Sequence, residues 1–94
     1  TANGSYVMLK VNVTQEHINK GERCSSSSCP IAWALKDALS VHCYGVNVRA
    51  SEATWFENGY WHRTWLPDTA QHFVVEFDKG HNMEPFSFEL DANV

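Results

Sequence analysis

The sequence has 94 residues, of which 44% are hydrophobic and 13% aromatic, and its formal net charge is -4 at pH 7. A chain of this length encloses one hydrophobic core, so we expect a single domain, 1–94, and the apolar content argues against wholesale disorder. The acidic balance disfavours a duplex nucleic acid partner, and no apolar run is long enough to span a membrane.

The first part of the chain is expected to form a strand, a short helix and a longer helix. Residues 6–13 alternate apolar and polar side chains, the period of a half-buried strand. Thr14 can cap a short helix at 15–20, which Gly21 would end. Pro30 suits a first helical turn, so a second helix should run from there to about residue 40. Its expected buried stripe consists of Ile31, Ala34, Leu35, Ala38 and Leu39.

The middle of the chain predicts three strands. The segment 44–50 should be a strand with its valines facing inward. The segments 54–57 and 60–65 flank Asn58-Gly59, a dipeptide that readily adopts positive φ at both positions. These two segments therefore predict a hairpin with a two-residue turn.

The last part of the chain predicts a helix and a closing strand. The helix should open at 66–68 and run to about Lys79, with Gly80 as its stop, and residues 83–90 should be a strand with one wet face. The inner stripe of this helix should contain Ala70, Phe73, Val74 and Phe77. We therefore expect an α+β fold, a mostly antiparallel sheet of four to five strands with two main helices packed on one face.

The motifs VTQEHINKG, CPIAWAL, FDKG and EPFSFEL lie near both ends of the chain and in both main helices. Together they resemble a family of small uncharacterised proteins of bacteriophages and prophages. The motifs mainly encode helix caps and core positions, so they indicate fold more than function. The resemblance implies a viral accessory protein that acts in the cytoplasm of the infected bacterial host, on host defence or host machinery.

A serine-rich loop precedes the second helix and predicts an anion site. Free N–H groups and partial positive charge at a helix start favour a phosphate or carboxylate. Small hydroxyl side chains would let such a ligand approach, and the candidates are Ser26, Ser27 and Ser28. The loop lacks the glycine spacing and lysine of a nucleotide-hydrolase phosphate loop. The alternative is a mobile loop in which Ser28 only caps the helix.

The hairpin carries aromatic side chains on both faces. A two-residue turn predicts four cross-strand pairs: Glu57 with Tyr60, Phe56 with Trp61, Trp55 with His62, and Thr54 with Arg63. Only one face can meet the core, so the other offers a stacking surface beside a polar group. The alternative is that the aromatic pairs only hold the hairpin together. The candidate ligand-binding residues of this region are Arg49, Tyr60, Trp61, Arg63 and Trp65.

Metal binding and catalysis find weaker support. Cys24, Cys29, His42 and Cys43 could form a tetrahedral zinc site, but adjacent ligands such as the last two are rare. Cys29 near a helix start could act as a nucleophile, but the sequence places no base beside it. The odd cysteine count favours reduced thiols in a cytosol. The acidic residues Asp37, Glu76, Asp78 and Glu89 alternate with apolar ones, as on a solvated face. We therefore expect no metal, no cofactor and no enzyme.

Two binding functions remain. The first is a sponge that sequesters a host nucleotide immune signal, such as a cyclic dinucleotide, with phosphates at the serine loop and bases on the hairpin beside Arg49 and Arg63. The second is an inhibitor that docks the aromatic hairpin onto a host protein, since Trp, Tyr and Arg dominate protein interfaces. A small cysteine- or metal-dependent enzyme is the third hypothesis. A concave groove or dimer seam would favour the small ligand, and a convex patch the protein. A homo-oligomer is compatible with either.

Overall fold

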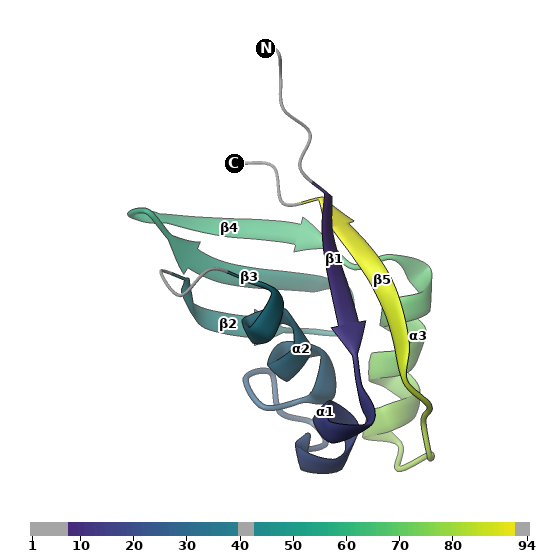
Figure 1. Ribbon diagram of the computed structural model, residues 1–94. Helices are drawn as coiled ribbons and strands as arrows, with labels where there is room; N and C mark the ends of the chain where they lie inside the picture. The colour runs from purple at the N-terminus through teal and green to yellow at the C-terminus, as the bar shows by residue number, and fades with distance from the viewer. Residues whose placement is uncertain (1–7, 40–42, 92–94) are drawn as a thin grey trace.

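The computed structural model describes residues 8–39 and 43–91, which form five strands and three helices (Figure 1). In chain order these are β1 (Met8–Val13), α1 (Gln15–Lys20), α2 (Pro30–Ala38), β2 (Tyr44–Val48), β3 (Glu52–Glu57), β4 (Tyr60–Trp65), α3 (Asp68–Asp78) and β5 (Phe86–Asp91). Every predicted element is present. Residues 6, 7 and 40, which the predicted first strand and second helix included, lie outside the described residues, and the other ends agree with the predictions within a few residues. None of the helices in the described ranges has the length and apolar character needed to cross a membrane.

The strands form two antiparallel sheets. β1 pairs with β5, the first and last strands of the described chain, and β2, β3 and β4 form a three-stranded sheet in that order. The α+β class is thus confirmed, but the expected single sheet of four to five strands is wrong. β1 and β5 run steeply across the direction of β2, β3 and β4 (Figure 1). The backbones of β1 and β5 therefore cannot continue the hydrogen-bond ladder of the three-stranded sheet.

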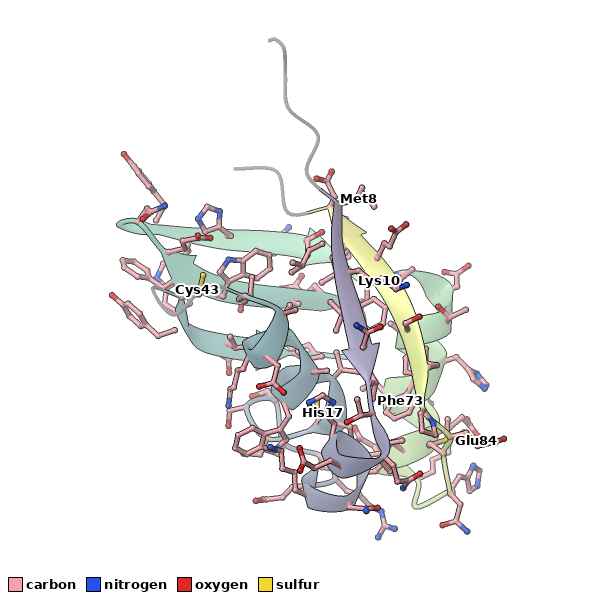
Figure 2. The ribbon with its side chains drawn as sticks, in the orientation of Figure 1. Met8, Lys10, His17, Cys43, Phe73 and Glu84 are labelled. Carbon is pink, nitrogen blue, oxygen red and sulfur yellow. The ribbon has the colours of Figure 1, made fainter. Side chains whose placement is uncertain are left out.

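One hydrophobic core joins the two sheets and the helices. α2 packs against both β1 and β2, and its expected stripe is buried at Ile31, Ala34 and Leu35. Ala38 and Leu39 pack against the core at its edge. All four residues of the stripe predicted for α3 are buried, and Figure 2 labels one of them, Phe73. The period-3.6 predictions for both main helices are therefore confirmed.

The ends of α1 are defined by local contacts. The Thr14 side chain accepts a hydrogen bond from the backbone N–H of His17, so the predicted cap is confirmed. Gly21 ends the helix as predicted, but in an extended conformation. A Cβ atom on Gly21 would lie 2.5 Å from the ring of Pro30, so glycine permits a close approach of the chain to the start of α2.

The start of α2 differs from the prediction by one residue. The capping residue is Cys29, whose Sγ accepts a hydrogen bond from the N–H of Ala32 at 3.4 Å. Ser28 therefore does not cap the helix. Cys29 is buried and carries a weak acceptor, so the cap satisfies a donor inside the core.

The hairpin of β3 and β4 has the predicted register. Asn58 and Gly59 adopt φ values of 53° and 85°, as a tight two-residue turn requires. Phe56 pairs with Trp61, and Trp55 with His62. Because side chains alternate along a strand, this register places Trp61, Arg63 and Trp65 on one face of the sheet.

Candidate functional site

Burial decides which face of the hairpin is available to a ligand. Trp55 is only 1% exposed and stacks on His62 with ring centroids 5.7 Å apart, so this face meets the core. Trp61 and Trp65, on the opposite face, are 65% and 64% exposed. The sheet therefore presents an aromatic outer surface, which we call the aromatic face: Tyr44, Phe56, Trp61, Arg63 and Trp65.

Ring contacts make the aromatic face continuous across three strands. Tyr44 of β2 lies 5.0 Å from Phe56 of β3, measured between ring centroids. Phe56 meets Trp61 of β4 edge-on at 5.3 Å and 74°. The guanidinium of Arg63 lies over the ring of Trp65 at 5.5 Å. These geometries are favourable for aromatic and cation–π pairs, so the exposed rings hold one another in place.

A glycine provides room for the largest ring of this face. Gly45 lies in β2, at an irregularity of the β2–β3 ladder, with φ of +68°. A Cβ atom there would stand 3.0 Å from Cη2 of Trp61. The indole of Trp61 therefore reaches across β3 and lies over the backbone of β2.

Two other candidate positions of the hairpin region lie elsewhere. Tyr60 is exposed, but it is on the core side of the hairpin near the turn, opposite Trp61. Arg49 lies beyond the end of β2, where its N–H donates to the carbonyl of Glu52. Of the predicted hairpin contacts, the aromatic face thus contains only Trp61, Arg63 and Trp65.

The serine loop covers an edge of the three-stranded sheet. The carbonyl of Ser26 accepts the N–H of Val48 at 2.7 Å, and its hydroxyl donates to Asn47. The carbonyl of Ser27 accepts the ammonium of Lys36 at 2.7 Å. Ser26 and Arg49 line a small cavity of about 180 Å³, so the structure brings these two candidates together.

A carboxylate already lies beside this loop. Asp78 also lines the small cavity and accepts the N–H of Cys24 at 2.9 Å. Burial raises the pKa of the Cys29 thiol above its usual value, hydrogen bonds from Ala32 and Ile31 oppose the rise, and the charge of Asp78 adds to it. The negative charge of Asp78 makes the place less favourable for a second anion.

The two halves of the predicted nucleotide site are not joined. Within residues 8–39 and 43–91, no hydrogen bond or ring contact links Ser26, Ser27 or Ser28 to the aromatic face. The serine loop instead belongs to the edge of β2 and the start of α2. The small cavity beside Ser26 and the hollow beside Trp61 and Arg63 share no lining residue.

The sequence analysis missed a buried histidine, His17, that pairs with the carboxylate of Asp37. His17 lies between α1 and α2, where its Nδ1 accepts the N–H of Thr14 at 3.0 Å (Figure 2). Its Nε2 is 2.6 Å from a carboxylate oxygen of Asp37 and donates to it. Asp37 lies on the exposed face of α2 as expected, with 66% of its side chain exposed, but its contact with His17 was not anticipated. The spacing of Thr14 and His17 fits a capping box with histidine in place of glutamate, which is the one signal in the sequence.

The same pair raises the question of catalysis, because the Thr14 hydroxyl is 3.0 Å from Nδ1 of His17. A hydroxyl, an imidazole and a carboxylate in a row can generate a nucleophile. Here the lone pair of Nδ1 is directed to the backbone N–H of Thr14, so it is not free to take the hydroxyl proton. We interpret the row as a structural tie between α1 and α2.

The cysteines do not converge. Cys24 is exposed, Cys29 is buried and Cys43 is half-buried, and none of the three forms a disulfide. Among the residues that the structure describes, no three His, Cys, Asp or Glu side chains are grouped to hold a metal ion. His42, the remaining member of the hypothetical zinc set, lies outside the described residues.

Comparison with protein-family models, with curated proteins and with solved structures gave no significant match. We therefore infer function from the side chains themselves.

Proposed function

We propose that this protein is a non-catalytic binding protein that docks onto another protein through the aromatic face. The observation that carries the proposal is the exposure of Trp61 and Trp65 on one side of a three-stranded sheet, with Arg63 between them. Large exposed aromatic patches mark interaction sites, and Trp, Tyr and Arg supply most of the energy at protein interfaces.

The aromatic face is organised before any partner arrives. Trp61 is held edge-on by Phe56 and lies over Gly45, and Arg63 lies on Trp65. Side chains that are already ordered lose less conformational entropy on binding. The mutual support of these rings therefore favours a role in recognition.

A protein partner suits this face better than a nucleotide. The aromatic rings lie on the open side of a sheet, and Arg63 is its only cationic side chain. That guanidinium also faces Glu52, with 3.7 Å between Nε and the carboxylate oxygen. Single-stranded nucleic acids and nucleotide phosphates call for more positive charge beside the stacking rings. Sequestration of a nucleotide signal is accordingly the weaker of the two binding hypotheses.

The resemblance to phage accessory proteins makes a protein of the bacterial host the expected partner. Under this proposal the interaction takes place in the host cytoplasm and blocks the partner by occupying its surface. No chemical step is required of the bound protein.

Differential capture tests the proposal. Immobilised wild type, Trp61→Ala, Trp65→Ala and Val75→Ala proteins are exposed to extract from the cells in which the protein is naturally made. Val75 is an exposed apolar residue of α3, outside the aromatic face, and serves as the matched control. We expect one protein to be retained by wild type and Val75→Ala and lost from both tryptophan variants. Retention by all four would contradict the proposal, as would a nucleotide that binds wild type with a micromolar or lower Kd and requires Trp61.

A further inference from the structure

In the described part of the chain, 8–39 and 43–91, the outer edge of β4 pairs with no strand. Arg49 N–H donates to the carbonyl of Glu52, and Leu66 N–H donates to that of Ser51. Even-numbered residues of β3 therefore bond to β2, and odd-numbered residues bond to β4. In an antiparallel ladder this alternation continues, so the N–H and C=O groups of Trp61 and Arg63 point away from β3.

The two edges of the three-stranded sheet are treated differently. At the β2 edge, the N–H of Val48 is taken by the carbonyl of Ser26, and the strand is irregular between Tyr44 and Asn47. At the β4 edge, neither proline nor lysine interrupts the strand. Proteins usually protect a free edge with such devices. The charged residue of β4, Arg63, lies over the ring of Trp65, so the edge next to the exposed aromatic rings fits a pairing surface.

A hollow of about 600 Å³ follows the β4 edge. It is lined by four consecutive residues, 60–63, together with Trp55, Asn58 and Asp91. Consecutive strand residues point to opposite faces, so they can line one hollow only along the edge of the strand. Beyond this hollow β4 contacts β5 without pairing with it.

We propose that the partner adds an extended segment to the edge of β4, and that this segment carries a carboxylate beside Arg63. This inference rests on the proposed function, since it names how the partner docks. Backbone hydrogen bonds to Trp61 and Arg63 would supply affinity, and alternate side chains would supply specificity. The added strand would extend the aromatic face by one strand.

The register of β4 defines the sequence that fits. Outward-facing residues of the added strand would lie beside Trp61, Arg63 and Trp65 in turn. Apolar side chains suit the indoles of Trp61 and Trp65. An acidic side chain suits the guanidinium of Arg63, since the Arg63 side chain is 63% exposed. The segment therefore alternates as apolar, acidic, apolar at every second residue. The residues between them face the hollow, where the half-buried ring of His62, stacked on buried Trp55, provides aromatic surface.

A library of short random peptides, selected on the immobilised full-length protein, tests the inference. Arg63→Pro removes the outward N–H without touching the β3 ladder, a change that edge strands tolerate. Arg63→Gln keeps that N–H and removes only the charge. The enriched peptides should show the alternating pattern and lose detectable binding to Arg63→Pro. They should bind Arg63→Gln about tenfold more weakly, with a smaller dependence on salt.

Amide hydrogen exchange of the wild-type protein gives a readout that does not depend on how Arg63→Pro folds. Saturation with an enriched peptide should slow exchange at Trp61 and Arg63, and leave Trp55 and His62, which already pair, unchanged. Absence of enrichment over Arg63→Pro, or exchange at Trp61 and Arg63 that stays fast in the complex, would overturn the inference. Protection of these amides by self-association alone would overturn it as well, because the occupant would be a second copy.

Failure of this inference can be told apart from failure of the proposed function. If docking uses only the rings, partner capture still requires Trp61 and Trp65 but survives Arg63→Pro. If the proposed function is wrong, capture is insensitive to the tryptophans themselves.

Discussion

The indole ring of Trp61 lies over Gly45, which belongs to a strand that is not adjacent to its own, and a Cβ atom on residue 45 would stand 3.0 Å from the ring. The aromatic face therefore depends on a position where the sequence has no side chain. The spacing of Gly45 and Trp61 along the chain does not predict this contact.

Gly45→Ala should disturb both the backbone and the ring. The φ of +68° costs a residue with a Cβ about 1–2 kcal/mol, and the contact with Trp61 adds to this. Gly59→Ala is the matched control, because Gly59 has φ of +85° but a Cβ atom there would meet nothing within 4 Å. We expect Gly45→Ala to lower the free energy of unfolding more than Gly59→Ala and to change tryptophan fluorescence. Equal losses with unchanged fluorescence would mean that the ring does not lie over Gly45.

Removal of the Asp37 carboxylate should loosen α1 from α2. Asp37→Ala leaves the Nε2–H of buried His17 without its partner, which costs about 1–3 kcal/mol. Asp37→Asn keeps an acceptor oxygen and should cost less. Urea unfolding of the three proteins measures the difference. Identical stability of Asp37→Ala and wild type would show that the His17–Asp37 contact is not a structural tie.

The buried thiol of Cys29 should make stability depend on alkaline pH. Its pKa is raised by burial, so the folded protein holds the thiol proton above the pH at which the unfolded chain releases it. The resulting stability is present below the ordinary thiol pKa of 9.0 and is lost as pH rises through the folded value. The difference in unfolding free energy between wild type and Cys29→Ala should therefore shrink above about pH 9. A constant difference up to about pH 10.5 would show that Cys29 titrates normally.

Phe73 should contribute strongly to the core. It is buried, stacks on Phe77 at 5.9 Å and lies 4.9 Å from Phe86, measured between ring centroids. Phe73→Ala should cost about 3–5 kcal/mol, whereas His72→Ala, at the exposed neighbouring position, should cost little. Thermal and chemical unfolding measure both, and similar values would refute the assigned inner face of α3.

Local patterns in the sequence predicted the elements well. Alternation and the Asn58-Gly59 turn gave the hairpin and its cross-strand pairs, and the 3.6-residue period gave the buried stripes of α2 and α3. The division into two sheets could not be predicted in this way. It depends on β5 pairing with β1, which lies at the other end of the described chain, and no local pattern encodes that choice.

The candidate site shows the same limit. The sequence indicated that one aromatic face of the hairpin would be exposed, but both faces carry tryptophan, so burial of Trp55 had to come from the structure. The contact of His17 with Asp37 joins residues twenty positions apart in sequence, where spacing carries no signal. The anion site predicted at the serine loop rested on the partial positive charge of a helix start. The sequence could not show that Asp78, from the distant helix α3, lies beside this loop and accepts the N–H of Cys24.

Site-specific photo-crosslinking tests the central claim most directly. Trp61 is replaced by p-benzoylphenylalanine in one protein and Val75 in a second, and each is irradiated in the cells in which the protein is naturally made. We predict one protein partner crosslinked from position 61, absent from position 75, and lost when Trp65→Ala is added to the first protein. Equal crosslinking from both positions, or crosslinking from position 61 that persists without Trp65, would contradict recognition through the aromatic face.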